Sequence, residues 1–95
     1  MDKVFRAIAH PARRKILELL RFGPLSAGAL AVSFDFSKPT LSAHLAKLLA
    51  ADLVCHERVE GGRVYRINTS VVEDALSGLF KLLGLNDSRR ASDVS

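Results

Sequence analysis

The sequence predicts a small, mainly α-helical domain that carries one short β-hairpin. Apolar residues recur at helical spacing along residues 2–53 and again over about 71–85. Residues that cap or break helices divide these stretches into separate helices. Between these stretches the spacing changes to alternation, and Gly61 and Gly62 separate two strand-like runs. A chain of 95 residues has room for one such domain and is too short for two.

Two helices are predicted at the start of the chain. The first covers residues 2–9, and the second begins near Pro11, because proline suits the first turn of a helix and the residue before it avoids the helical region. Gly23 and Pro24 end the second helix. Arg13 falls near its buried stripe, so we expect a structural role in which the guanidinium pairs with a carboxylate or a carbonyl.

Two further helices follow, each with a serine at its N-cap. Ser26 caps a helix over about 27–34, and Ser37 caps one that runs to about residue 50. Asp35 lies in the short connection, where aspartate tolerates the left-handed conformation that a tight turn often needs. The second of these helices buries a face made by Leu41, Leu45, Leu48 and Leu49. Two helices joined by a short turn and followed by a basic hairpin are the arrangement of a winged helix-turn-helix.

A last helix and a polar tail complete the chain. Strands are predicted at 54–60 and 63–68, and a helix over about 71–85. Residues 86–95 have no periodicity, so we expect a frayed, disordered tail after one domain of residues 1–85. The last helix is apolar over about half its circumference, whereas packing on one domain needs a stripe of only about 100°. We therefore expect a homodimer formed through the first and last helices. The expected interface residues are Val4, Phe5, Ile8, Val72, Leu76, Leu79, Phe80 and Leu83.

The helix over residues 37–50 is the first candidate for contact with double-stranded DNA. No acidic residue occurs from Ser37 to Ala51, whereas an ordinary solvated helix face, which is the alternative, usually includes some. Small side chains permit close approach to the major groove, and lysine, threonine, serine and histidine reach base edges or phosphates. The expected contact residues are Ser37, Lys38, Pro39, Thr40, Ser42, Ala43, His44 and Lys47.

Arginines on the hairpin are the second candidate. Arg58, Arg63 and Arg66 lie on or near it, and a two-stranded ribbon with arginines at its tip can contact a phosphate backbone or enter a minor groove. The alternative is a strand edge protected by charge, and Glu57 and Glu60 interrupt the basic character.

Composition narrows the class of protein. The formal charge is +4, and residues 1–66 hold eleven Lys or Arg against six Asp or Glu, which favours a polyanionic partner. The single cysteine, Cys55, excludes an internal disulfide and fits a reducing compartment. No signal peptide is recognisable, and no apolar run approaches the ~18 residues of a membrane span. We therefore expect a cytoplasmic protein.

Neither a cofactor, a metal site nor an enzyme is expected. Cys55 and His56 are neighbours on a strand and would point to opposite faces, while His10 and His44 lie on different helices. CxxC and HxxxH spacings do not occur, and neither does a nucleophile–base motif or a glycine-rich phosphate loop. The rival function class is a winged helix whose last helix binds another protein and that does not read DNA sequence.

Two motifs and the hairpin resemble the ArsR family of bacterial repressors. Residues 10–20 (HPARRKILELL) are similar to the family's D-P-T-R-x-x-I-L-x-L-L opening, and residues 37–45 (SKPTLSAHL) are similar to its recognition-helix motif. The match covers residues 3 to about 85 and is strongest to a metal-independent autorepressor branch. The residues that resemble the family's wing are Leu53, Val54, Arg58, Gly62, Arg63 and Tyr65.

The resemblance implies a dimer that represses its own or neighbouring genes by occupying a near-palindromic operator. Metal-sensing members carry Cys-x-Cys on the third helix, where this chain has residues 30–34 (LAVSF). Others place His and Asp ligands on the last helix, which here contains no His or Cys. His10 replaces the usual aspartate before the proline, so a weaker helix cap is expected. An unknown inducer or an anti-repressor protein remains open as a further partner. By position, the groove-reading residues would be Lys38, Pro39, Thr40, Ala43 and His44, supported by Ser37 and Ser42.

Overall fold

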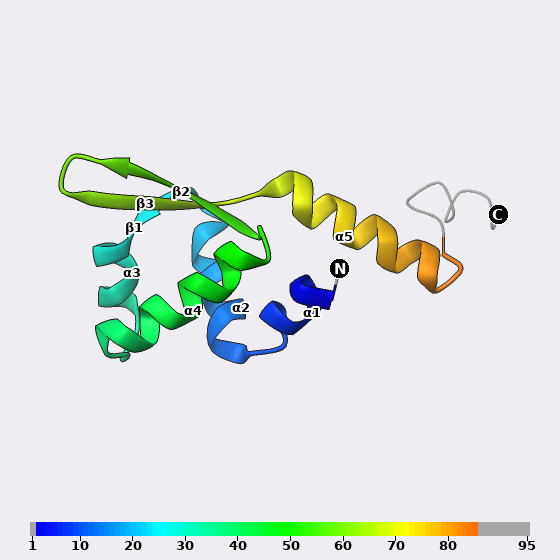
Figure 1. Cartoon of the computed structure of the whole chain (residues 1–95), viewed down its shortest axis with the longest axis horizontal. Helices are drawn as coiled ribbons and strands as arrows, with labels where there is room; N and C mark the ends of the chain where they lie inside the picture. Colours follow the sequence, from blue (N-terminus) through cyan, green and yellow to red (C-terminus); the bar gives the residue numbers. More distant parts are fainter. Residues whose placement is uncertain (1, 86–95) are drawn as a thin grey trace.

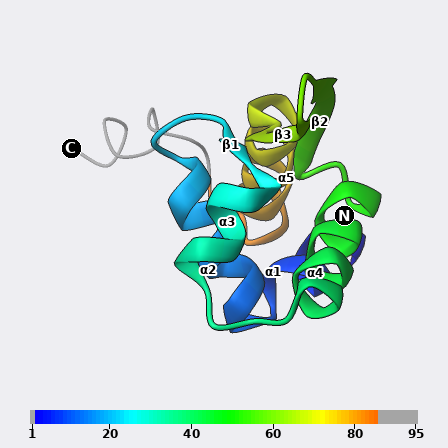
Figure 2. The same cartoon turned by 90° about the vertical axis from the view of Figure 1, so that its left-hand side faces the viewer.

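Helices α1 to α4 pack into one body, from which a β-hairpin and the helix α5 project, in the computed structural model of the chain (Figures 1 and 2). The structure describes residues 2–85, and the expected tail at 86–95 lies outside them. The mainly helical winged helix-turn-helix architecture is confirmed. The elements are α1 (Asp2–Ile8), α2 (Pro11–Leu20), β1 (Leu25–Ser26), α3 (Ala27–Ser33), α4 (Lys38–Ala50), β2 (Val54–Val59), β3 (Gly62–Ile67) and α5 (Thr69–Leu82).

Side-chain caps begin three of the helices where the sequence predicts them. The hydroxyl oxygens of Ser26 and Ser37 accept hydrogen bonds from the backbone N–H groups three residues onward, at 3.0 and 3.3 Å. His10 caps α2 in the same way, because its Nδ1 accepts from the N–H of Ala12 at 3.1 Å. A histidine in place of the usual aspartate was expected to weaken this cap. The imidazole of His10 nevertheless caps the helix.

The left-handed residue lies at the end of α4 and not in the turn before it. Expecting this conformation at Asp35 was wrong, since Asp52 (φ 59°) is the one non-glycine residue with positive φ in the described chain. The N–H of Asp52 donates to the carbonyl of Leu49 at 2.9 Å, and that of Leu53 donates to Leu48 at 3.0 Å. This pattern is a Schellman motif, which requires a left-handed residue just after the helix.

The sheet has one strand more than the hairpin predicted from the sequence. Leu25 and Ser26 form the short β1, which pairs with β3 and gives an antiparallel sheet of order β1-β3-β2. Two residues are too few to show alternation, so the sequence carried no signal for this strand. Val59 pairs with Gly62, so the tight turn consists of Glu60 and Gly61 rather than of the two glycines.

The core lies between the helices and the base of the sheet. Ile16, Leu30 and Leu48 are its largest fully buried side chains, and Tyr65 of β3 closes it from the sheet. Leu49, expected on the buried face of α4, is only half-buried because it packs at the margin of the core.

Arg13 links α2 to α1 through hydrogen bonds, and these bonds confirm the structural role expected for it. Its Nε donates to the carbonyl of Ala7 at 2.8 Å and its Nη2 to that of Arg6 at 3.4 Å. Arg14 donates from Nη1 to the carbonyl of Ile8 at 2.7 Å. Two guanidinium groups thus satisfy carbonyls at the C-terminus of α1, where cations are favoured.

Helix α5 extends away from the body (Figure 1) and starts and ends about two to three residues earlier than predicted from the sequence. None of its residues is buried in the described chain; Leu76 is 50% exposed and Leu82 is 74% exposed. A groove of about 210 Å³ runs between α5 and α1. The expected interface residues that line it are Val4, Phe5, Ile8, Val72, Leu76 and Leu79. Phe80 and Leu83 lie nearer the end of α5, outside this groove.

Candidate nucleic-acid interface

Helix α4 presents one leucine face to the core and the opposite face to solvent. Leu41, Leu45 and Leu48 are buried, as the leucine spacing predicts. Ala46 and Ala50 also lie on the exposed side, although the sequence analysis did not single them out. Because these side chains are small, a partner can approach the outer face of the helix closely. The expected contact residues that are exposed are Ser37, Lys38, Pro39, Thr40, Ser42, Ala43 and Lys47.

The N-terminus of α4 is fixed by a pair of hydroxyl groups. The hydroxyl of Ser37 donates to Oγ1 of Thr40 at 2.9 Å and accepts from the N–H of Thr40 at 3.3 Å. Both hydrogen-bonding functions of Ser37 are therefore occupied within the protein, whereas the hydroxyl hydrogen of Thr40 remains able to donate outward. Ser37 accordingly orients the helix start, and Thr40 is the better placed of the two to contact a partner.

An aromatic cluster, which the sequence analysis missed, supports the turn before α4. Phe34 and Phe36 stack with ring centroids 4.9 Å apart, and Phe36 contacts His44 at 5.5 Å. His44 also contacts His10 at 4.6 Å, so the cluster joins the turn, α4 and the start of α2. The signal was the Phe-x-Phe spacing, but no sequence rule pairs it with a histidine from another helix.

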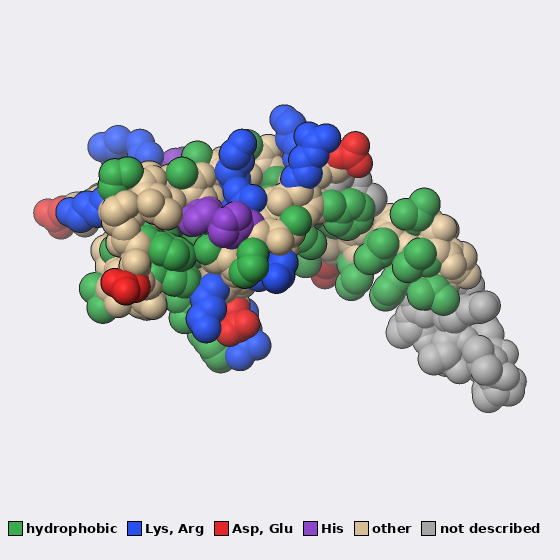
Figure 3. Space-filling model, turned by 90° about the horizontal axis from the view of Figure 1, so that it is seen from below, with side chains coloured by type: hydrophobic (Ala, Val, Ile, Leu, Met, Phe, Trp, Pro, Cys, Tyr) green, Lys and Arg blue, Asp and Glu red, His purple; other side chains and the backbone are tan. Residues whose placement is uncertain are grey.

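The pKa of His44 is lowered from its usual value of 6.5. Burial is the first cause, and the charges of His10 and Arg13 add to it. His44 is therefore neutral near pH 7 and offers a hydrogen-bond donor and an acceptor rather than a fixed charge. Figure 3 shows histidine side chains near the middle of the lower face, with lysine and arginine side chains beside them.

The register of the hairpin separates the three arginines expected to contact DNA. Arg58 lies directly opposite Arg63 across the two strands, near the tip. Alternation along the strands places both on the same face as Tyr65, whereas Arg66 lies on the other face, opposite Cys55. Like charges directly opposed across strands are destabilising unless an anion neutralises them. The structure thus brings two of the three arginines together.

The structure also bears on the cysteine, the metal site and the membrane span that were considered from the sequence. Cys55 is half-buried on β2. Within residues 2–85, no three His, Cys, Asp or Glu side chains gather closely enough to hold a metal ion. Over the same residues, no helix has the length and apolar character to cross a membrane.

Comparison with known sequences identifies the helix-turn-helix. Residues 8–57, more than half of the chain, match the family model described as a helix-turn-helix domain. The transcriptional repressor SdpR of Bacillus subtilis is 38% identical over 88 residues, which cover 93% of this chain and 98% of that protein. The similar proteins are named as repressors and regulators of transcription and not as enzymes, in agreement with the expectation that the chain is not an enzyme.

Two solved structures share the fold. An ArsR-like transcriptional regulator from Rhodococcus sp. RHA1 has a TM-score of 0.81 at 26% identity, over 87% of this chain and 76% of the other. A homodimeric winged helix-turn-helix DNA-binding domain from Mycobacterium bovis, described as a possible ArsR-family regulator, has a TM-score of 0.70 at 30% identity, over the same shares of the two chains.

Proposed function

Because the chain belongs to the ArsR family of helix-turn-helix transcriptional repressors, we propose that it acts as a homodimer that represses its own or neighbouring genes. It does so by occupying a near-palindromic operator. The observation that carries this proposal is the solvent-exposed face of α4, which has small and hydrogen-bonding side chains and no acidic residue from Ser37 to Ala51. Such a face can enter the major groove without repulsion from phosphates.

In the proposed complex α4 reads sequence through a short set of side chains. Thr40, Ala43 and His44 lie where base edges would be, since the N-terminal part of a recognition helix makes the base contacts. Lys38 and Lys47 are exposed and serve as phosphate contacts at either end of the helix. Ser37 holds the start of the helix in place through its bonds to Thr40.

The wing adds affinity through Arg58 and Arg63. Their direct opposition near the hairpin tip is unfavourable in isolation and becomes favourable when a phosphate lies between them. Arg66 lies on the opposite face and is not part of the proposed contact.

The proposed dimer forms through α1 and α5. Leu76 and Val72 on α5 are exposed in the single chain and line the apolar groove shared with α1. Covering this groove with the same groove of a second copy gives a two-fold interface, and two-fold symmetry of the protein matches a near-palindromic site. The domain from Mycobacterium bovis that is described as homodimeric supports a homodimer for this chain.

The proposed repressor has no metal-sensing site of the kinds known in the family. The stretch Leu30 to Phe34, where metal-sensing members carry Cys-x-Cys, has no cysteine, and α5 has no histidine or cysteine. The signal that relieves repression is accordingly a ligand other than a metal held at those positions, or an anti-repressor protein.

The experiment is DNA binding measured with the DNA upstream of the chain's own gene and with a random duplex, each at several salt concentrations. Footprinting first locates the protected site. Thr40→Ala and Ala43→Glu are expected to reduce the preference for the operator, each by about 1–3 kcal/mol. Arg63→Ala is expected to weaken binding to both duplexes equally and to lower the salt slope by about 1. Arg66→Ala is the matched control on the same strand and should leave the slope unchanged.

The same measurement separates the rival function. A winged helix that binds only another protein shows no duplex binding that falls steeply with salt. If Arg63→Ala abolished operator preference while Thr40→Ala and Ala43→Glu preserved it, the roles assigned to the wing and to α4 would be reversed.

A further inference from the structure

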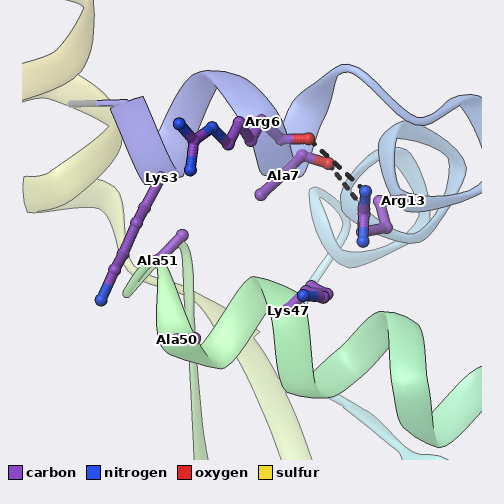
Figure 4. Close-up of a pocket in the computed structure, with 7 residues that line it drawn as sticks. All are labelled: Lys3, Arg6, Ala7, Arg13, Lys47, Ala50 and Ala51. Carbon is purple, nitrogen blue, oxygen red and sulfur yellow. Dashed lines mark hydrogen bonds between the residues drawn. The ribbon is translucent and has the colours of Figure 1, made fainter.

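We propose that a basic pocket at the C-terminal end of α4, formed with α1 and α2, binds a phosphate group of the DNA backbone beside the groove that α4 enters. The proposal rests on the proposed DNA-binding function and extends its contact surface beyond α4 and the wing. The pocket has a volume of about 250 Å³. Its cationic side chains are Lys3, Arg6, Arg13 and Lys47 (Figure 4).

The lining of the pocket is chemically suited to an anion. Cations come from three helices, and no acidic side chain of the described chain lines the pocket. The rest of the lining consists of Ala7, Ala50 and Ala51, whose short side chains leave room between the cations. Gathering these positive charges without a counterion is unfavourable by simple repulsion, and one phosphate would relieve it.

Arg13 is already oriented for this task. Its guanidinium is held by the carbonyls of Ala7 and Arg6, at 2.8 and 3.4 Å. These bonds use Nε and one hydrogen on Nη2, so N–H groups remain that can donate to a phosphate oxygen. Binding of a phosphate there would cost little side-chain conformational entropy, because the guanidinium of Arg13 is already fixed before binding.

The position of the pocket on α4 indicates that the phosphate belongs to DNA. Helix α4 has 13 residues and is therefore about 20 Å long, whereas the major groove is only about 12 Å wide. When its N-terminal half contacts bases, its C-terminal end must approach the backbone that borders the groove. Lys47 belongs both to the exposed face of α4 and to the pocket, so the two surfaces are continuous.

Lys3→Ala and Arg6→Ala test the proposal, because both residues are exposed and neither side chain takes part in a hydrogen bond that holds the described fold. Each variant is expected to lower the salt slope of duplex binding by about 1. Affinity for operator and random DNA should fall by the same factor, so that their ratio is unchanged. Lys15→Ala is the matched control, since Lys15 is exposed on α2 and does not line the pocket. Unchanged thermal unfolding would confirm that the variants fold.

The outcomes distinguish the pocket from the function on which it rests. If the parent protein shows no salt-dependent duplex binding, the proposed function fails. If the parent binds but Lys3→Ala and Arg6→Ala keep its slope, only the phosphate site in the pocket is overturned. A titration with inorganic phosphate and pyrophosphate forms the second arm. Tight binding of either probe that Lys3→Ala abolishes, with the DNA slope unchanged, would assign the pocket to a free ligand and overturn the DNA contact.

Discussion

The imidazole rings of His10 and His44 lie in contact, with centroids 4.6 Å apart and planes inclined by 59°. His10 is at the same time the N-cap of α2, because its Nδ1 accepts the N–H of Ala12. Burial and the charges of His10 and Arg13 lower the pKa of His44 in this contact. The contact therefore favours the neutral form of His44 at the surface where α4 would meet DNA.

The stability of the fold should fall at mildly acid pH. The pKa of His44 is below its usual value of 6.5 in the folded chain, through burial and the charges of His10 and Arg13. Between pH 6.5 and the lowered folded pKa the unfolded state binds more protons, so stability falls as the pH decreases through this window. Above pH 6.5 the group contributes no pH dependence. We expect His44→Gln to flatten this part of the curve in urea unfolding at a series of pH values.

His56→Gln is the control for that series. His56 is exposed on β2 and lies outside the ring contacts that His44 makes with His10 and Phe36, so the decline attributed to His44 should persist in this variant. Because glutamine also alters packing, the slope and not the absolute stability is the quantity compared. A parent-like slope in His44→Gln would show that this histidine does not cause the decline.

Removal of the Arg13 guanidinium should destabilise the fold. Arg13→Ala loses the bonds to the carbonyls of Ala7 and Arg6, at a site where a charged donor satisfies a helix end. Hydrogen bonds to charged groups contribute about 1.5–3 kcal/mol, so a loss of about 2 kcal/mol is expected in chemical denaturation. Arg13→Lys keeps the charge without the planar fork and should recover only part of the loss. Equal stability of all three proteins would contradict a structural role.

Glycine at position 52 should stabilise the chain. Asp52 has a φ of 59°, which glycine adopts without the steric cost that a side chain imposes. Asp52→Gly is expected to raise the free energy of unfolding by about 0.5–1 kcal/mol. Asp35→Gly is the control, because Asp35 does not have positive φ, and glycine there should lower stability. A shift of the midpoint of thermal unfolding in the same direction by both substitutions would contradict a requirement for the left-handed conformation at residue 52 alone.

A charge in the groove between α1 and α5 should prevent dimer formation. Leu76 is 50% exposed in the single chain, so Leu76→Glu leaves the core of each copy intact but buries a carboxylate in the proposed interface. Sedimentation equilibrium should give about twice the chain mass of 10.3 kDa for the parent and the single mass for the variant. Ser77→Glu, on the polar side of the same helix, should remain dimeric. A parent that sediments as a single chain would refute the dimer.

Local rules in the sequence were sufficient to place most elements. Ser26 and Ser37 mark helix starts because a hydroxyl can bond a backbone N–H three residues onward, and this requires no other part of the fold. Pro11 likewise sets the beginning of α2. The leucine spacing of α4 defined its buried face, and by difference the exposed face proposed to contact DNA, because helical periodicity is a property of the sequence alone.

Other features depend on segments that are distant in sequence. Strand β1 is too short to show a period and exists because it pairs with β3. The left-handed residue is Asp52 and not Asp35, since the path from α4 into β2 determines which turn needs that conformation. Alternation already separates Arg63 from Arg66 on β3, but the direct opposition of Arg58 and Arg63 required the strand register, which alternation alone does not fix.

The sequence by itself determined the helix order, the capping residues, the acid-free face of α4 and the apolar excess of α5. The tertiary structure decided which of these features lie together. Packing of three helices forms the basic pocket around Lys3, Arg6, Arg13 and Lys47, and it brings His10 against His44. Periodicity and capping act within one turn of a helix, whereas a pocket or a ring contact depends on how separate helices cross, and that is set by the shape of the whole core.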